Sequence, residues 1–301
     1  MNAVDPTSVF RSGYAAIIGA PNAGKSTLLN QLLGQKLSIT SKKPQTTRNR
    51  ILGVVHRTGS QIVFLDTPGI HRPKTPLNTR IVDIALATLS EVDLILLVAD
   101  AQTPDPASEQ LLLQRLTGQT LPVLLVLNKI DQVERTALLS QIQSWSVRFP
   151  FEAVVPVSAK TGEQVDRLVA VMEVSLPVGP PFFPSDSLTD LPMRFIAAEM
   201  IREKAIRLTG QEIPYAVAVT IDSFKAENGG GPVRIHASIH VERDSQKGIL
   251  IGRQGAKLKQ IGEAARLEIE KMLGSKVFLK LFVRVQKNWT RDTKALRKFG
   301  Y

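Results

Sequence analysis

The stretch from Gly19 to Thr27 reads Gly-Ala-Pro-Asn-Ala-Gly-Lys-Ser-Thr, and its residue types and spacing suit the binding of a polyphosphate. Its glycines let the backbone curl so that successive N–H groups point into one hollow. Lys25 would reach the β- and γ-phosphates as a point charge, and the Ser26 hydroxyl would hold Mg²⁺. The residues predicted to bind phosphate are Gly19, Ala20, Pro21, Asn22, Ala23, Gly24, Lys25, Ser26 and Thr27.

An acidic residue further along the chain supplies a second metal ligand. Asp66 ends the apolar run 61–65 and is followed by Thr67-Pro68-Gly69. A carboxylate at the end of a buried strand, beside a glycine N–H that can meet a γ-phosphate, is what a nucleotide-sensing metal site needs. We therefore expect Asp66 to hold Mg²⁺, through water, and Gly69 to contact the γ-phosphate.

Two more strand ends carry residues that would recognise a base. Asn128-Lys129-Ile130-Asp131 follows an apolar run, and the Asp131 carboxylate would accept hydrogen bonds from N1–H and the 2-amino group of guanine. Adenine offers an acceptor and no 2-amino group there, so a carboxylate would reject it. Lys129 would lie along the ring, and Asn128 would tie neighbouring loops together. The next strand end, Ser158-Ala159-Lys160, would place a backbone N–H against guanine O6. Alone, the Asn-Lys-x-Asp string is also typical of a helix-capping turn.

These residues all fall where strands alternate with helices. Continuous apolar strands between amphipathic helices predict a mostly parallel sheet with helices on both faces, an α/β fold that gathers ligands at the carboxyl ends of its strands. We expect strands at 14–18, 51–56, 61–65, 93–99, 122–127 and 153–157, and helices at 28–33, 78–91, 108–116, 135–148 and 163–174. Polar segments at 41–48 and 70–76 are expected to be loops.

A proline-rich segment divides the chain. Five prolines fall between residues 176 and 192, which is typical of a stiff linker. We therefore predict three parts: a nucleotide-binding domain at 12–176, a linker at 177–192 and a second domain at 193–301.

The second domain has a different order of elements. The pattern predicts a helix at 191–208, strands at 215–224 and 232–242, a short apolar helix, a Gly-x-x-Gly turn at 252–255, a helix at 256–273 and a strand at 276–286. This αββααβ order is similar to that of a type II KH domain, whose Gly-x-x-Gly loop clamps about four nucleotides of single-stranded RNA or DNA. The residues expected to bind RNA are Lys247, Gly248, Ile251, Gly252, Arg253, Gln254, Gly255, Lys257 and Lys259.

Charge and composition agree with a nucleic-acid partner. The 301-residue chain has a net charge of +11, and residues 243–301 carry 15 Lys and Arg against 5 Asp and Glu. Such a concentration points to an anionic polymer or an anionic membrane surface. Trp289 lies in this stretch, where it would either stack a base or pack in the core. The chain has no cysteine, which excludes thiol nucleophiles and Cys-ligated metal sites and fits a reducing cytoplasm.

Taken together, these motifs, with Gln45-Thr46-Thr47-Arg48, resemble those of the bacterial Era family of GTPases from about residue 13 to residue 297. The resemblance implies an α/β P-loop GTPase domain followed by an α+β type II KH domain. It also implies a slow, Mg²⁺-dependent GTPase that alternates between GTP and GDP and acts in rRNA processing and small ribosomal subunit biogenesis. Its partners would be 16S ribosomal RNA near the 3′ end and the small ribosomal subunit. A monomer is expected, in the cytoplasm or peripheral on the inner face of the cell membrane.

Some residue roles come from the resemblance. Ile70 follows Gly69 where Ras-like enzymes carry a water-orienting glutamine, which implies slow intrinsic hydrolysis. Asn22 resembles an asparagine that helps bind K⁺ in some relatives. Thr46 and Thr47 are both expected to bind the nucleotide, and Thr47, or as the second choice Thr46, is expected to close onto Mg²⁺ only with GTP. Lys25, Thr47 and Asn22 are therefore the expected catalytic residues, and Ser26, Thr47 and Asp66 the metal ligands.

Two other readings remain open from the sequence. One is an RNA-binding chaperone or adaptor whose nucleotide site is degenerate. The other is a P-loop ATPase that remodels nucleic acid, against which Asp131 argues.

Overall fold

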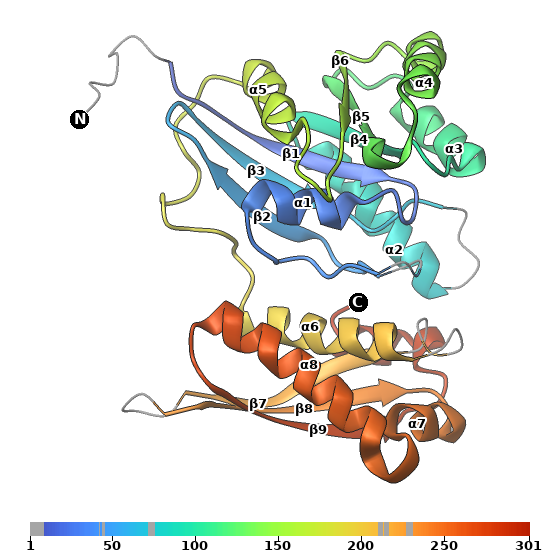
Figure 1. Ribbon diagram of the computed structural model, residues 1–301, viewed down its shortest axis with the longest axis vertical. Coiled ribbons are helices and arrows are strands. Elements are labelled where there is room, and N and C mark those ends of the chain that lie inside the picture. Colours follow the sequence, from blue (N-terminus) through green and yellow to red (C-terminus); the bar gives the residue numbers. More distant parts are fainter. Residues whose placement is uncertain are drawn as a thin grey trace. The chain divides into compact units, whose positions relative to one another are not determined.

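The structure is a computed structural model, and it describes residues 9–41, 43, 46–71, 76–209, 213, 217–226 and 231–301. The chain forms two units, drawn in Figure 1, and each is described by itself. The first comprises Met1–Ser38, Thr47–Pro73 and Ile81–Asp190, and the second comprises Ile39–Thr46, Lys74–Arg80 and Leu191–Tyr301. The loops expected at 41–48 and 70–76, the strand expected at 215–224 and the segment between it and the strand expected at 232–242 fall partly outside the described residues.

A six-stranded sheet in the order β2-β3-β1-β4-β5-β6 forms the centre of the first unit. All its neighbouring strands are parallel except β2 and β3, so the predicted mostly parallel sheet is confirmed. Its strands are apolar on both faces because helices cover both faces (Figure 1). The strands are β1 (Arg11–Gly19), β2 (Ile51–His56), β3 (Ser60–Asp66), β4 (Leu94–Asp100), β5 (Val123–Asn128) and β6 (Ala153–Val157).

The helices that alternate with these strands begin and end close to their predicted bounds. Helix α4 and strand β6 coincide with the predicted ranges, and the predicted helix 78–91 is an α-helix that continues as a 3₁₀ turn. The helices are α1 (Lys25–Leu33), α2 (Pro76–Ala87), η1 (Thr88–Glu91), α3 (Pro106–Leu116), η2 (Ile130–Gln132), α4 (Arg135–Arg148) and α5 (Val165–Ser175).

The proline-rich segment, predicted as a linker, is hydrogen bonded along much of its length to the first unit. The N–H of Ser12 donates to the Pro177 carbonyl at 3.1 Å, and the N–H of Val54 donates to the Leu188 carbonyl at 2.8 Å. The Gln61 side chain accepts from the backbone of Phe182 at 2.7 Å. Proline removes a donor but leaves each carbonyl free to accept, so composition alone does not say that such a segment lacks partners.

The second unit has the predicted αββααβ order around a sheet in the order β7-β8-β9. Strands β7 and β8 are antiparallel and β8 and β9 are parallel. Helices α6 and α8 cover one face of this sheet (Figure 1). The elements are α6 (Met193–Leu208), β7 (Ala218–Lys225), β8 (Val233–Val241), α7 (Asp244–Ile251), η4 (Arg253–Gly255), α8 (Ala256–Leu273), β9 (Val277–Val285), η5 (Trp289–Arg291) and α9 (Thr293–Lys298).

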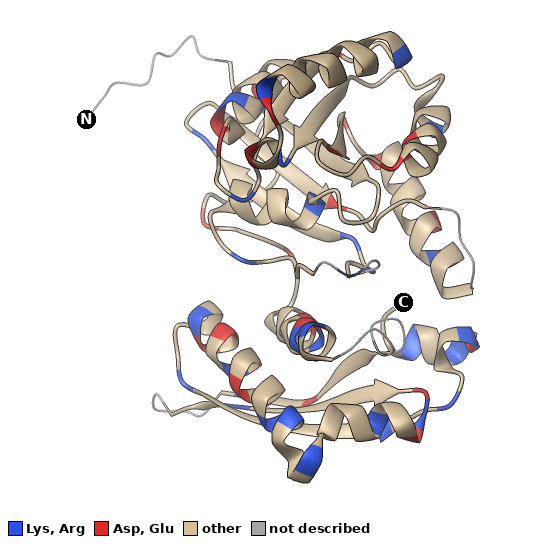
Figure 2. Ribbon diagram, turned by 45° about the vertical axis from the view of Figure 1, so that its right-hand side comes forward, with Lys and Arg blue, Asp and Glu red and all other residues tan. Residues whose placement is uncertain are grey.

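The carboxy-terminal segment packs into the second unit. Trp289 is fully buried, with its ring 5.2 Å from that of Phe299 and 5.9 Å from that of Tyr301. Of the two roles expected for Trp289, packing is therefore the one the structure supports, because a buried ring cannot stack on a base. Many Lys and Arg residues of this unit lie on α7, α8 and α9 (Figure 2).

His240 gives the second unit a testable dependence on pH. Its Nε2 lies 2.9 Å from the Thr220 hydroxyl, and its ring packs on Phe299 at 4.5 Å. Burial lowers the pKa of His240 to about 4, with Arg284 and Lys298 acting in the same direction and Asp222 opposing them. Between about pH 6.5 and pH 4 the unfolded chain binds a proton that the folded chain does not. The free energy of unfolding should therefore fall as the pH is lowered through this window.

Denaturant unfolding, followed by Trp289 fluorescence in a Trp145→Phe background, would measure this effect. His240→Gln should flatten the dependence between pH 6.5 and pH 4. The matched control is His236→Gln, on the same strand but only partly buried. Equal slopes for wild type and His240→Gln would contradict the assignment.

Candidate functional site

The predicted phosphate-binding stretch links the end of β1 to the start of α1. Gly24 precedes the helix in the left-handed region, with φ 97°, and a Cβ there would lie 2.1 Å from Nδ2 of Asn128. The buried Lys25 Nζ donates to the Gly19 and Ala20 carbonyls at 3.1 and 2.8 Å. Burial lowers the pKa of Lys25 to about 8, although Asp66 opposes the shift. Lys25 is therefore held inside the loop, where the negative charge of a phosphate would stabilise the ammonium form that burial disfavours.

Three predicted metal ligands lie together behind this loop. The Ser26 hydroxyl lies 2.8 Å from the Thr47 hydroxyl and donates to Asp66 Oδ2 at 2.7 Å. Asp66 is fully buried, and its Oδ1 has no hydrogen-bond partner among the described residues. Burial raises the pKa of Asp66, against the opposing effects of Ser26, Lys25 and Ser38. A divalent cation would satisfy the unpaired oxygen and the buried charge, so this set of oxygen ligands fits Mg²⁺.

The structure distinguishes the two candidate threonines. Thr47 presents its hydroxyl to Ser26, whereas the Thr46 hydroxyl donates to the Lys43 carbonyl at 2.7 Å. Thr47 therefore has the position that a metal ligand needs, and Thr46 does not.

Sequence reasoning missed Ser38, whose hydroxyl donates to Asp66 Oδ2 at 2.9 Å. Asn30 holds it there by accepting from the backbone N–H of Leu37 and Ser38, each at 2.8 Å. No spacing rule marks a serine that follows a helix, so the sequence offered no signal for it.

Gly69 and Ile70 bring the end of β3 against the phosphate-binding loop. A Cβ at Gly69 would lie 2.8 Å from the Pro21 Cα, and the Ile70 N–H donates to the Gly19 carbonyl at 3.1 Å. The Ile70 side chain is only 1% exposed and belongs to the apolar core of the unit. A side chain buried in this way cannot orient an attacking water.

The residues predicted to recognise a base meet at the ends of β5 and β6. Asn128 donates to the Ala23 carbonyl at 2.8 Å and accepts from the Ala159 N–H at 2.9 Å. It therefore ties three loops together, as expected. Asp131 accepts from the Ser158 hydroxyl at 2.7 Å, which is the largest of the effects that lower the pKa of Asp131.

An ionised, largely exposed carboxylate at Asp131 can accept two hydrogen bonds from a guanine edge. Lys129 stands beside it in the left-handed region, with φ 70°, and forms an ion pair with Asp100. Asp100, at the end of β4, was not predicted as a site residue. In the sequence it belongs to no motif, and only its position at the end of a neighbouring strand indicates it.

The predicted Gly-x-x-Gly turn joins α7 to α8 with an unusual backbone. Gly252, Gln254 and Gly255 have φ of 69°, 51° and 81°. A Cβ at Gly252 would lie 2.6 Å from the Lys257 Cβ, whereas a Cβ at Gly255 would meet open space. Gly252 is therefore needed for the turn to pack against α8. Gly255 leaves the outer surface of the turn clear, so that the sugar–phosphate backbone of a nucleic acid can approach.

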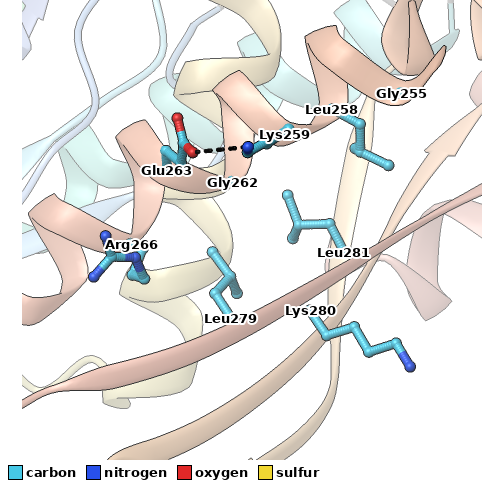
Figure 3. Close-up of a pocket in the computed structure, with 9 residues that line it drawn as sticks. All are labelled: Gly255, Leu258, Lys259, Gly262, Glu263, Arg266, Leu279, Lys280 and Leu281. Atoms are coloured by element: carbon cyan, nitrogen blue, oxygen red, sulfur yellow. Dashed lines mark ion pairs between the residues drawn. The ribbon is translucent and has the colours of Figure 1, made fainter.

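A groove between α8 and β9 begins at this turn (Figure 3). Its volume is about 330 Å³, and Leu258, Leu279 and Leu281 form its apolar floor. Lys259, a predicted RNA-binding residue, lines it and lies 4.0 Å from Glu263. The remaining lining residues are Gly255, Gly262, Glu263, Arg266 and Lys280.

Most of the other predicted RNA-binding residues do not line this groove. Lys257 lies in the first turn of α8, and those on α7 or in the turn are Lys247, Gly248, Ile251, Gly252, Arg253 and Gln254. Sequence reasoning missed the three leucines because it assigns apolar residues to the core. The groove lining has three cations, Lys259, Arg266 and Lys280, and one carboxylate, Glu263. This excess of positive charge beside an apolar floor suits unpaired nucleotides, since cations meet phosphates and the floor meets bases.

Two family models match the chain. Residues 14–129 match the model described as 50S ribosome-binding GTPase, and residues 212–290 match the model described as KH domain. Among the residues that the structure describes, no helix is long and apolar enough to cross a membrane.

Similar proteins extend over nearly the whole chain. The GTPase Era of Geobacter metallireducens is 56% identical over 97% of this chain and 98% of its own length, and that of Geotalea uraniireducens is equally similar. A crystal structure of an Aquifex aeolicus Era variant bound to GDP·AlF4⁻ superposes with a TM-score of 0.93 and 43% identity, covering 97% of this chain and 99% of its own. A structure of Era with MgGDPNP and nucleotides 1506–1542 of 16S ribosomal RNA gives the same values.

Proposed function

The chain belongs to the Era family of GTPases, and from that premise we propose that it is a switch whose GTP state controls binding of 16S ribosomal RNA near the 3′ end. Its role would be in rRNA processing and the assembly of the small ribosomal subunit. The structure of a relative that holds both MgGDPNP and this part of 16S ribosomal RNA supports the proposal.

The residues that the structure brings together each have a task in this scheme. Lys25 and the backbone of the phosphate-binding loop would hold the β- and γ-phosphates, and Asp131 would select guanine. Ser26, Thr47 and Asp66 would hold Mg²⁺, which neutralises charge between the phosphates when bound. This complete set of ligands argues against an adaptor with a degenerate site, and Asp131 argues against an ATPase.

The path of the chain just before Thr47 is the observation that supports coupling between the nucleotide and the RNA-binding domain. Thr46 and Thr47 are consecutive, yet the segment Ile39–Thr46 belongs to the second unit and Thr47 to the first. Within the second unit, buried Arg202 of α6 donates to the Thr46 carbonyl, and Glu203 accepts from the Thr40 N–H at 3.0 Å. A nucleotide that fixes Thr47 therefore acts on a segment anchored to α6.

RNA affinity in the presence of a GTP analogue and of GDP tests this coupling. Wild-type protein should bind the 1506–1542 RNA with affinities that differ about five- to 150-fold between the two nucleotides. The variant Glu199→Gln with Arg202→Met removes the anchor and its paired carboxylate together, because Arg202 donates to Glu199 at 2.7 Å. The difference should then shrink to about twofold or less.

The matched control is Arg194→Met, a change at an exposed position on the same helix. Thermal unfolding would establish that each variant is folded. A nucleotide dependence that survives the loss of Arg202 would contradict coupling through this segment.

We also propose that K⁺ assists hydrolysis beside Asn22. Support comes from buried Ile70, which cannot orient water, and from Asn22, an exposed loop residue with φ 64°. A cation that does the work of an arginine finger can be worth about a thousandfold or more in rate. GTP turnover should therefore be at least about tenfold faster in KCl than in NaCl, and Asn22→Ala should remove the difference. Equal turnover of the wild type in both salts would contradict the role.

We propose a cytoplasmic location, which the absence of cysteine supports. Peripheral association with the inner face of the cell membrane and a monomeric state remain predictions of the family resemblance.

A further inference from the structure

The face of the KH sheet that α6 and α8 do not cover carries two exposed phenylalanines. Phe278 and Phe282 of β9 are 49% and 39% exposed. The register of β8 and β9 pairs Arg234 with Phe278 and His236 with Lys280, which puts all five side chains on one face, because alternate residues of a strand point the same way. We call Arg234, His236, Phe278, Lys280 and Phe282 the open-face cluster.

Cations lie against both rings of the open-face cluster. The Arg234 guanidinium carbon lies 5.8 Å from the centroid of Phe278, and Lys280 Nζ lies 5.3 Å from that of Phe282. His236 meets Phe282 edge-on, with centroids 6.5 Å apart and planes at 80°. The rings nevertheless keep much of their surface exposed. Exposed aromatic faces flanked by fixed positive charges offer stacking to a base and an ion pair to its phosphate.

From this arrangement we propose that the open-face cluster is a second RNA-binding surface, which stacks two unpaired bases of the RNA whose other nucleotides lie in the groove beside the Gly-x-x-Gly turn. The inference rests on the proposed function, and it adds to that function a second surface. Stacking on phenylalanine requires bases that are not paired, so the ligand is single-stranded.

The cluster is continuous with the groove. Strand β9 is the edge strand of the sheet, so one of its faces lines the groove while the other carries the two phenylalanines. Lys280 links the two faces. It is one of the residues that line the groove, but its side chain points away from Leu279 and Leu281 (Figure 3), and its Nζ lies against the ring of Phe282 on the other face. A strand of RNA leaving the groove at β9 therefore meets a cation first and the rings next.

Charge favours RNA over a protein partner as the occupant. An apolar protein surface would have to desolvate Arg234 and Lys280 without offering them a counter-charge, whereas RNA brings one phosphate for each nucleotide. The rings are four residues apart, or about 13 Å along a strand, so they would take two separate bases.

The test compares full-length variants in the presence of a GTP analogue. Phe278→Ala with Phe282→Ala should weaken binding of the 1506–1542 RNA about tenfold for each ring removed. Binding of a four-nucleotide fragment, measured by NMR titration, should not change, because the groove alone holds that length. Phe278→Tyr with Phe282→Tyr should keep the affinity for the long RNA, because tyrosine also stacks.

Leu267→Ala is the matched control, since Leu267 is 58% exposed on α8 and lies outside the cluster. Equal affinity of the double alanine variant and the wild type for the long RNA would overturn the proposal and leave the face to a protein partner. An equal loss for the long and the short RNA would also overturn it, because it would indicate damage to the groove. If the proposed function itself were wrong, the result would differ from both of these, because the wild type would not bind the long RNA.

Discussion

Asp131→Asn is expected to lower the affinity for GTP roughly a hundredfold to ten-thousandfold and to raise the affinity for xanthosine triphosphate. The carboxylate can accept from N1–H and from the 2-amino group of guanine, and each hydrogen bond to a charged group contributes about 1.5 to 3 kcal/mol. An amide in its place would still accept from N1–H, but its NH₂ would face the 2-amino group as donor against donor. The lost hydrogen bond is then joined by the cost of unpaired donors, about 1 to 3 kcal/mol. Xanthine carries an oxygen at that position, which the amide can meet.

The geometry around Asp131 makes this change a local one. Ser158 holds one carboxylate oxygen at 2.7 Å and can equally donate to an amide oxygen, so the loop should keep its shape. Asp166→Asn, an exposed carboxylate on α5, is the matched control and should leave both affinities unchanged. Titration with GTP, ATP and xanthosine triphosphate would measure all three preferences. An unaltered GTP affinity in Asp131→Asn would rule out this residue as the reader of guanine.

Changing Gly252 and Gly255 together to Asp is expected to reduce RNA binding at least about a hundredfold while GTP hydrolysis remains. At Gly252 the added Cβ would lie 2.6 Å from the Lys257 Cβ, which forces the turn away from α8. At Gly255 nothing obstructs the side chain, so the new carboxylate would stand where an RNA phosphate should approach. Both effects act on the same few nucleotides.

Gly274→Asp supplies a control for each single change, because it adds one carboxylate at a glycine that also has a positive φ. Gly274 ends α8 with φ 64°, and a Cβ there meets open space, but it lies at the opposite end of the helix from the turn. Gly255→Asp alone, which introduces no close contact, separates the effect of charge from the effect of shape. RNA binding that persists in the double variant would contradict the assignment of this turn as the RNA clamp.

Patterns confined to a few neighbouring residues were predictable from the sequence. Helices α4 and α8 and strand β6 have the predicted bounds, because the apolar period of each element, and the glycines at both ends of α8, act within one element. The phosphate-binding loop, Asp66 and the Asn-Lys-x-Asp string were found for the same reason: each is a short string whose chemistry depends on its own spacing.

The sequence by itself determined which chemistry the chain can perform, since a lysine after glycines, a carboxylate at a strand end and a Gly-x-x-Gly turn carry their function in their residue types. Tertiary structure decided which distant side chains complete each site. Ser38 meets Asp66, Asp100 meets Lys129, and Thr47 rather than Thr46 meets Ser26, because strand register and loop path bring them together. The two phenylalanines of β9 look like core residues in the sequence, and only the sheet, with helices on one face, leaves them exposed.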